Sequence, residues 1–412
     1  TRDSDNTGRI FNVQGGSVTI NGADADSTIT LRGNRTLADG TWTDGDITGS
    51  LIGSDSANAP IELDENVILE NNYANQGGAI YLYNQGTLTI NGATIQNNKS
   101  KNSGGAIFAS GTTTNTINII SGSISNNTAV SGGAIYAKST TITISGGTFD
   151  ANASTNNGGF INTESDVDIT VTGGELTNTN TSWNGAFMIS AGCSLTITGG
   201  KFNNNKNKVI YASGTGATVE VSGDDTEFSG NTSTSGGVFL IRNASLTING
   251  GSYTNNSATS YYGGVIDTEA GATITINGGT FSGNTAKAYG GVINAVKEGT
   301  VVNITGGTFT GNTGTVRAGV IFADTKAVVN ISGTPKFTDN KAQHGGAIFA
   351  ISSSQVNIEG GEFTGNTVSG NGAVIYVHTS SAVNITGDAV CTTIVAHQNK
   401  ALDKSVFYAE EN

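Results

Sequence analysis

The chain has 412 residues, of which 60 are glycine, 2 are proline and 12% are charged, and its formal net charge at pH 7 is −13. A chain this acidic repels a phosphate backbone and has no basic run to offset the repulsion, which excludes nucleic acid as a partner. No run of about 18 apolar residues occurs, so we expect no membrane insertion by a helix of this chain.

The first 48 residues lack the regular spacing of the rest of the chain. Gly8 and Gly49 match the first glycine of a motif that recurs further on, and 41 residues (49 − 8) separate them. This step is about 14 residues longer than the later ones, which predicts an insertion within residues 23–46 that includes Trp42. We expect the insertion to cap the first turns or pack against them; a small binding loop and a side strand are the alternatives.

From residue 49 to residue 387 a Gly-Gly-Ala-Ile motif recurs at an almost constant period. Eleven steps from Gly77 to Gly372 cover 295 residues (372 − 77), about 27 residues a step. Recurrence at a fixed period of this length is typical of a solenoid, in which each repeat is one turn. The fourth position is isoleucine or phenylalanine throughout, which predicts an inward column. Alternation then places the third and fifth positions outward. The first positions are Gly77, Gly104, Gly132, Gly158, Asn184, Asn207, Gly236, Gly263, Gly290, Ala318, Gly345 and Gly372.

A second column runs in phase with the first and reads as an apolar residue, two small or polar residues, and asparagine. A turn asparagine tolerates left-handed backbone, and asparagine amides stacked at the spacing of solenoid turns bond one another. We therefore predict a structural asparagine ladder without a ligand role. Its members are Asn98, Asn127, Asn152, Asn205, Asn231, Asn256, Asn284, Asn312, Asn340 and Asn366.

A third column is a strand in which threonine alternates with an apolar residue, as at residues 87–90 and 273–276. Three short strands per period, stacked like on like, predict an all-β fold: a single-stranded right-handed parallel β-helix of about 15 coils. Stacked coils share one core, so we expect residues 1–412 to form one continuous β-helix. Its regular coils span 49–387, and an irregular coil covers 388–412.

The end of the chain and the two cysteines carry further expectations. No amphipathic capping helix is visible in residues 388–412. Because an uncapped solenoid end exposes pairing edges, we expect the native polypeptide to continue. Cys193 and Cys391 lie about seven coils apart, which at ~4.8 Å a coil is too far for a disulfide. We expect both thiols to be free.

The two in-phase motifs resemble those of the polymorphic membrane proteins, which are surface autotransporter adhesins with β-helical passenger domains. Gly-Gly-Ala-Ile stands at residues 77–80, 104–107, 132–135 and 345–348, and Phe-x-x-Asn at 149–152, 281–284 and 363–366. The resemblance covers about residues 49–387. It implies an adhesin-like surface protein of a bacterium. The coils are more regular than in that family, and no membrane-barrel segment is present, which leaves the mode of anchoring open.

Groups that could carry catalysis or bind a metal are sparse. Asp166 and Asp168 alternate onto one face and could contact calcium, but the next coil adds no carboxylate to complete a cage. Asp267 and Glu269 share a strand, and Arg242 stands in register with Glu269 one coil earlier, which favours a surface ion pair over a catalytic pair. We predict no catalytic residue, no metal site and no cofactor-binding residue, and therefore a protein without cofactor that is not an enzyme.

The outward fifth position of the Gly-Gly-Ala-Ile-Tyr strand carries a series of aromatic residues. An exposed apolar strip marks an interface, and stacked rings suit sugars or protein partners. We predict a binding strip, unless the register is off by one residue and the rings pack inside. The strip comprises Tyr81, Phe108, Tyr136, Tyr211, Phe322, Phe349 and Tyr376.

These features together predict an extracellular, adhesin-like or structural surface rod that binds without catalysis. The expected partner is a protein or glycan ligand on a cell surface, held by the repetitive face; lateral self-association is an equal alternative for the strip. A carbohydrate-active β-helix, related in mechanism to polysaccharide lyases or glycoside hydrolases, is the alternative function.

Overall fold

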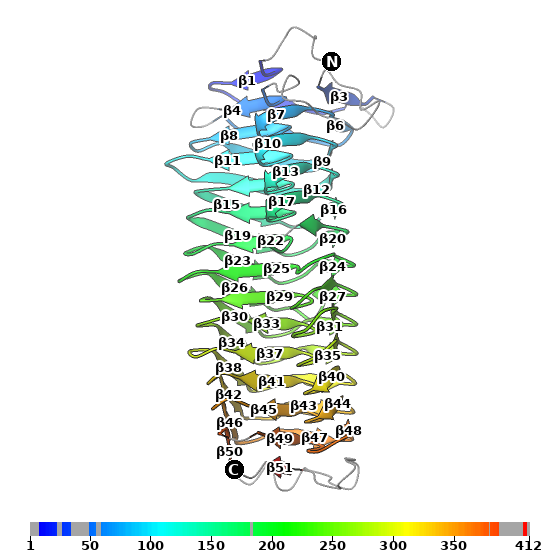
Figure 1. Ribbon diagram of the computed structural model, residues 1–412. Helices are drawn as coiled ribbons and strands as arrows, with labels where there is room; N and C mark the ends of the chain where they lie inside the picture. The colour runs from blue at the N-terminus through cyan, green and yellow to red at the C-terminus, as the bar shows by residue number, and fades with distance from the viewer. Residues whose placement is uncertain are drawn as a thin grey trace. The chain divides into compact units, whose positions relative to one another are not determined.

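A computed structural model of the chain contains strands and turns, with no helix among the residues that it describes. Those residues are 8–22, 27–33, 49–54, 59–181, 184–378, 380–386 and the backbone of 407–409. The chain divides into two units, Thr1–Lys201 and Phe202–Asn412. In each unit successive turns of chain pair through parallel strands, which confirms the predicted parallel β-helix (Figure 1). The continuity of one β-helix over residues 1–412 stays a prediction.

Three groups of parallel strands build the first unit. The Gly-Gly-Ala-Ile strands form the first sheet: β1 (Phe11–Val13), β4 (Ile52–Ser54), β8 (Ile80–Tyr83), β11 (Ile107–Ser110), β14 (Ile135–Ala137), β18 (Ile161–Thr163) and β22 (Phe187–Ile189). The second sheet bends and carries two rows. The threonine-alternating row is β2 (Val18–Ile20), β5 (Ile61–Leu63), β9 (Thr87–Gln96), β12 (Asn115–Ser125), β15 (Thr140–Ile144), β19 (Val167–Val171) and β23 (Ser194–Ile197). The row that precedes the ladder asparagine is β3 (Ile29–Arg32), β6 (Val67–Glu70), β16 (Thr148–Asp150), β20 (Glu175–Thr177) and β24 (Lys201–Asn203), and β9 and β12 run through both rows.

The third sheet of the first unit follows the ladder asparagine and was not predicted from the sequence. It consists of β7 (Tyr73–Gln76), β10 (Lys99–Ser103), β13 (Thr128–Ser131), β17 (Ala153–Asn157) and β21 (Asn180–Thr181). Its residues are mostly polar and alternate little, so the sequence gives no strand signal there. The three predicted strand columns therefore occupy two sheets, and this segment supplies the third.

The second unit repeats the arrangement. Its first sheet is β25 (Ile210–Ser213), β29 (Phe239–Arg242), β33 (Ile266–Thr268), β37 (Ile293–Val296), β41 (Ile321–Asp324), β45 (Ile348–Ala350), β49 (Ile375–Val377) and β51 (Phe407–Ala409). The threonine-alternating row is β26 (Thr218–Val221), β30 (Ser245–Ile248), β34 (Thr273–Ile276), β38 (Val301–Ile304), β42 (Val328–Ile331), β46 (Gln355–Ile358) and β50 (Ala382–Ile385). The next row is β27 (Glu227–Ser229), β31 (Ser252–Thr254), β35 (Thr280–Ser282), β39 (Thr308–Thr310), β43 (Lys336–Thr338) and β47 (Glu362–Thr364). The third sheet is β28 (Thr232–Ser233), β32 (Ser257–Ala258), β36 (Thr285–Ala286), β40 (Thr313–Arg317), β44 (Lys341–His344) and β48 (Thr367–Val368).

The described residues form about 12 turns, slightly fewer than the 15 predicted, although the first sheet carries seven strands in the first unit and eight in the second. Among the described residues, the third sheet begins at β7 in the first unit and ends at β48 in the second. Within the expected insertion, β3 pairs in parallel with β6 as a member of the row before the ladder asparagine, and the role of the insertion stays a prediction. The remainder, residues 23–26 and 34–48 with Trp42, lies outside the described residues, as does Cys391. The Cys193 thiol is buried and free.

A glycine pair occupies the corner before many of the first-sheet strands. Gly77 has φ = 60°, in the left-handed region that favours glycine. At Gly78 an added Cβ would lie 2.0 Å from the carbonyl oxygen of Gly105 in the next turn, so any larger residue must displace backbone. At the same corner Ala318 replaces the first glycine and keeps φ = 57°. Close stacking of the turns thus depends on the missing side chains.

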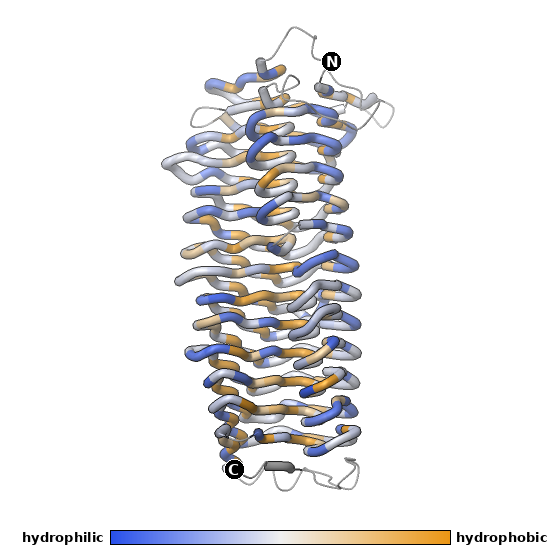
Figure 2. The backbone as a smooth tube through the Cα atoms, in the orientation of Figure 1, coloured by the Kyte–Doolittle hydropathy of each residue, from blue (hydrophilic) through white to orange (hydrophobic). Residues whose placement is uncertain are grey.

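The third position of the motif points inward, contrary to the prediction. Strand pairing begins at the fourth residue, and the corner at the glycine pair interrupts the alternation before it. Phe160, at a third position, has its ring 4.6 Å from that of Phe149 and 5.4 Å from that of Phe187, both of which are core residues. The fourth position is inward as predicted: Ile135 and Ile266 are fully buried. Figure 2 shows hydrophobic and hydrophilic residues alternating along the turns of each unit.

The core of the two units differs in the column before the ladder asparagine. In the first unit it begins with aliphatic residues such as Leu69, Ile95 and Ile124. In the second unit it is a stack of nearly parallel rings whose centroids lie 4.6–5.2 Å apart, formed by Phe228, Tyr253, Phe281, Phe309, Phe337 and Phe363. Each such ring pair contributes about 0.5–1.5 kcal/mol beyond the area that it buries.

The asparagine ladder is present in both units as a buried chain of amides. Asn284 is typical: its Nδ2 donates to the Tyr253 carbonyl at 2.8 Å and to Asn312 Oδ1 at 3.0 Å, and its Oδ1 accepts from the Asn256 backbone N–H at 2.9 Å. In the first unit, Asn98 and Asn127 make the same bonds, with 3.1 Å between Asn98 Nδ2 and Asn127 Oδ1. The left-handed residue is the one before the ladder asparagine, as at Gly283 (φ = 64°).

Candidate functional site

The aromatic residues of the predicted strip lie in register on adjacent strands of the first sheet. In the first unit Tyr81, Phe108 and Tyr136 stack with 5.2 Å between successive ring centroids. In the second unit Phe349 stacks on Tyr376 at 4.6 Å and contacts Phe322 at 5.8 Å. Tyr211 pairs with Leu240 instead of with another ring.

The expectation that this strip is exposed is wrong for most of its members. Phe322 and Phe349 are each only 2% exposed, and Phe108, Tyr211 and Tyr376 are also buried, whereas Tyr81 and Tyr136 are partly exposed. Each ring is covered by the rings one turn away and by flanking side chains: Tyr289 and Val296 pack against the cluster that contains Phe322. The strip is therefore mainly a packed outer layer and has no continuous open surface.

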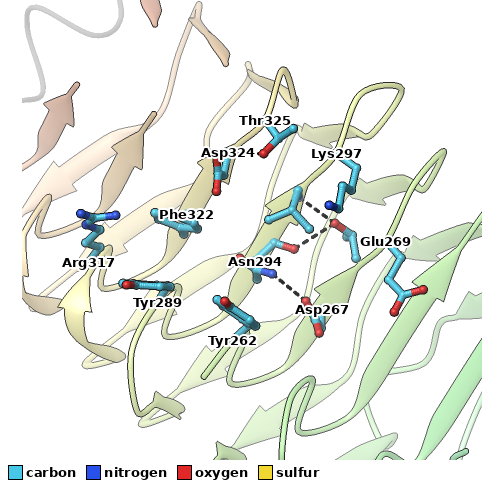
Figure 3. A pocket seen from close by; sticks show the side chains of 12 residues that line it. Tyr262, Asp267, Glu269, Tyr289, Asn294, Lys297, Arg317, Phe322, Asp324 and Thr325 are labelled. Carbon is cyan, nitrogen blue, oxygen red and sulfur yellow. Dashed lines mark hydrogen bonds between the residues drawn. The ribbon is translucent and has the colours of Figure 1, made fainter. Parts of the chain in front are cut away.

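The outer layer of the second unit opens into one cavity of about 430 Å³ (Figure 3). Three consecutive turns line it, and each gives a residue from the same three positions of the repeat. In the order of the three turns, the residue before the first position is Tyr262, Tyr289 and Arg317. The residue at the fifth position is Asp267, Asn294 and Phe322. The residue at the seventh position is Glu269, Val296 and Asp324. Thr268, Lys297 and Thr325 complete the lining.

The floor of the cavity carries a buried acid paired with an amide. Asn294 Nδ2 donates to Asp267 Oδ1 at 2.7 Å, and the two residues face each other on β37 and β33. Burial raises the pKa of Asp267 to about 6. The hydrogen bonds from Asn294 and Ser235 and the charge of Lys208 lower that pKa, and the charge of Glu269 raises it. Lys208 occupies the second position of its repeat, where most repeats have glycine. It is itself buried, and burial lowers its pKa.

The side-chain carbonyl oxygen of Asn294, Oδ1, is buried and accepts no hydrogen bond. Asn294 is 1% exposed, and its Oδ1 has no hydrogen-bond partner. The neighbouring polar atoms are engaged elsewhere, since Thr268 Oγ1 donates to the Asn294 backbone carbonyl at 3.0 Å and accepts from the Val296 backbone N–H at 2.9 Å. Buried polar atoms are nearly always paired in folded proteins, so Asn294 Oδ1 is an exception at the edge of the cavity.

Aromatic rings form one side of the cavity. The Tyr262 and Tyr289 ring centroids lie 5.6 Å apart, and the Tyr289 ring stacks on Phe322 at 4.8 Å. The Arg317 guanidinium lies 5.2 Å from the Tyr289 centroid and 4.9 Å from the Phe349 centroid, which fixes it over the rings. Figure 3 shows Tyr262, Tyr289 and Arg317 in a row along this side.

The opposite side of the cavity is charged. Glu269 pairs with Arg242 at 3.4 Å, as the register predicted. Asp324 accepts from Thr325 Oγ1 at 3.1 Å, and Lys297 lies at the same side. In the described part of the chain no three His, Cys, Asp or Glu side chains are grouped so that they could hold a metal ion.

A second hollow, of about 470 Å³, lies over the threonine-alternating row of the second unit. An exposed amide ladder lines it: Asn330 Nδ2 donates to Asn303 Oδ1 at 2.9 Å, and Asn357 and Asn384 continue the series at 2.8 and 2.9 Å. These amides bond one another, so the hollow presents a solvated amide surface.

The residues of the cavity that Tyr262 and Asp267 line are only partly predictable from the sequence. The sequence places Asp267 and Glu269 on one strand, but it gives no reason to group them with Asn294, Tyr262 or Tyr289. The signal that could have found them is the position before the glycine pair, where Tyr262, Tyr289 and Arg317 follow at steps of 27 and 28 residues.

The comparisons with known proteins concern the repeat. The Chlamydia polymorphic membrane protein repeat matches residues 66–83, 92–110 and 121–138. Three segments of the first unit are thus similar to this repeat. Each matched segment of the first unit contains a strand of the first sheet, β8, β11 or β14, with its glycine pair. No curated protein and no solved structure matches the chain. Of the described residues, none form a helix of the length and apolarity that would span a membrane.

Proposed function

We propose that the chain is the ligand-binding part of a bacterial surface protein of the adhesin type and acts outside the cell. The polymorphic membrane protein repeats and the parallel β-helix fit a surface adhesin-like protein. The observation that carries the proposal is the cavity that three consecutive turns of the second unit form on the outer face of the first sheet. It offers rings, an acid and an unpaired amide oxygen to a partner on another cell or in its glycan layer.

Binding without catalysis is the proposed mode of action. Two carboxylates of the cavity have partners, since Asp267 accepts from Asn294 and Glu269 pairs with Arg242. Both groups are thereby held in fixed positions that suit recognition. One observation favours the alternative of a polysaccharide-cleaving enzyme: a carboxyl group with a pKa of about 6, as in Asp267, is suited to act as a general acid near neutral pH.

A cell-binding assay tests the proposal. Fluorescent beads coated with the 412-residue chain are expected to be retained on epithelial cell layers and on immobilised gastric mucin, above beads coated with serum albumin. Retention at the background level on both surfaces would contradict the adhesin function. Incubation of the chain with the same mucin and with plant and bacterial polysaccharides should release no reducing ends or unsaturated products; release of either supports the enzyme.

Surface display is tested separately. Antibodies against the chain should label intact cells of the source bacterium, and brief protease treatment of those cells should remove the label. Labelling that needs prior permeabilisation would contradict the proposed location.

A further inference from the structure

The cavity of the second unit combines three features that select one class of ligand. Asn294 Oδ1 is a buried acceptor that needs a donor, Asp267 lies beside it as a second acceptor, and the rings of Tyr262 and Tyr289 form a partly exposed apolar surface of the same cavity. A ligand that satisfies all three must carry hydroxyl or N–H donors at the edge of a compact apolar face. Sugar rings have this character, because their hydroxyls project from a ring whose C–H faces stack on aromatic side chains.

Other ligand classes fit less well. An acidic ligand would meet three carboxylates, Asp267, Glu269 and Asp324, against two cationic side chains among the lining residues, Lys297 and Arg317. A purely apolar ligand would leave Asn294 Oδ1 without a donor, which is unfavourable for a buried carbonyl. A metal ion lacks the grouped ligands among the described residues. The volume of about 430 Å³ is within the ~300–1,000 Å³ range of small-molecule sites and suits a short saccharide better than a folded protein.

We propose that this cavity is a saccharide site in which a neutral pyranose packs against the partly exposed ring of Tyr289 and donates a hydroxyl hydrogen to Asn294 Oδ1. The inference rests on the proposed adhesin function and names its ligand class. Asp267 accepts a second hydroxyl hydrogen, and Tyr262 extends the ring surface toward the next sugar. Three successive turns must therefore be present for the site to exist, since each supplies one row of its lining.

Glycan-array screening of the full chain, followed by calorimetric titration of the best neutral oligosaccharide, tests the site. Asn294→Ala is expected to weaken binding about tenfold or more, because it removes the acceptor. Tyr262→Ala, a change at a side chain that is 36% exposed, is expected to weaken it about threefold to tenfold. The matched control is Asn162→Ala in the first unit. Asn162 occupies the same repeat position as Asn294 and is also buried with an unpaired Oδ1. Its replacement should leave the affinity for the oligosaccharide within about twofold of that of the parent chain. Circular dichroism melting of each variant shows that it is folded.

The outcomes separate the site from the proposed function. If the chain binds mucin or cells but Asn294→Ala and Tyr262→Ala bind the saccharide as the parent does, the site is wrong and the adhesin function stands. The same holds if the array detects only acidic saccharides, or none, while cell binding persists. If neither the array nor the cell assay detects binding, both the site and the function fail.

Discussion

Asn162 in the first unit and Asn294 in the second occupy the same position of the repeat but have different surroundings. Both are buried, and in both the side-chain oxygen lacks a partner. Asn162 stands in register with the ring of Tyr136, whereas Asn294 lies between Asp267 and Phe322 and opens into a cavity. The repeat position thus fixes where a side chain lies, and the turns on either side determine what it can bind.

The hydrophobic cores of the two units also differ. The column before the ladder asparagine begins with aliphatic side chains in the first unit and is a stack of rings in the second, while the amide ladder beside it is the same in both. The units should therefore respond differently to changes in that column and alike to changes in the ladder.

The largest effect is expected from the ring stack. Phe309→Ala removes a fully buried ring that contacts Phe281 at 4.7 Å and Phe337 at 4.9 Å, and should cost about 3–5 kcal/mol of unfolding free energy. The smaller truncation Ile124→Val, in the same column of the first unit, removes a single methylene and should cost about 0.5–1.5 kcal/mol. Urea unfolding followed by circular dichroism measures both, and equal losses would show that the stacked rings do not determine the stability of the second unit.

Removal of a ladder asparagine should lower the unfolding free energy by the same amount in both units. Asn284→Ala and Asn127→Ala each remove a buried amide and leave the backbone carbonyl that it bonded, Tyr253 or Ile95, without that donor. Each change should cost about 2–3 kcal/mol in the same urea experiment. A loss in one unit alone would mean that the ladder has a different role in the other.

Asp267 should lower stability at neutral pH. Its pKa in the folded chain, about 6, is above its ordinary value of 3.8, so the folded state binds the proton more tightly and stability rises as pH falls from about 7 to about 4. Asp267→Asn keeps an acceptor for Asn294 and removes the charge. It should raise stability at pH 7 by on the order of 2 kcal/mol and show no gain on acidification.

Asn162→Asp provides the converse test in the first unit. It places a carboxyl group at the equivalent buried position, so it should lower stability at pH 7 and recover it near pH 4. Urea midpoints at the two pH values measure both variants. The explanation fails if Asp267→Asn is no more stable than the parent chain at pH 7.

Surface ion pairs should matter least. Lys138 pairs with Glu164 at 2.9 Å in the first unit, and Lys326 with Glu298 at 3.0 Å in the second, all with exposed side chains. Replacing either lysine by alanine should change stability by less than about 1 kcal/mol, and by less still at 1 M salt. A larger, salt-independent loss in either unit would indicate that the lysine stem packs on the sheet.

The sequence predicts most of the fold because one period places each residue type at one corner or strand. The glycine pair, the inward isoleucine and the ladder asparagine are readable, since each must recur in every turn for the turns to stack. The third sheet was missed because its polar residues have no alternation, and Phe160 was assigned outward because the corner at the glycine pair interrupts the period of two. Burial of Phe322 and Phe349 depends on flanking residues such as Tyr289, which belong to another column.

The cavity could not be predicted in the same way because it breaks the repeat. Asp267 and Asn294 replace rings of the outer column, and their acid–amide pairing depends on the register of β33 and β37. A search for the residue types that interrupt a column, rather than for those that continue it, would have directed attention to this place.

Hydrogen exchange with and without saturating oligosaccharide tests most directly the claim that three consecutive turns of the second unit form one binding site. Peptides that contain Tyr262, Asn294 and Arg317 should be protected together, while those that contain Tyr136 and Asn162 should exchange at unchanged rates. Protection centred on the first unit, or spread evenly over all turns, would contradict the account.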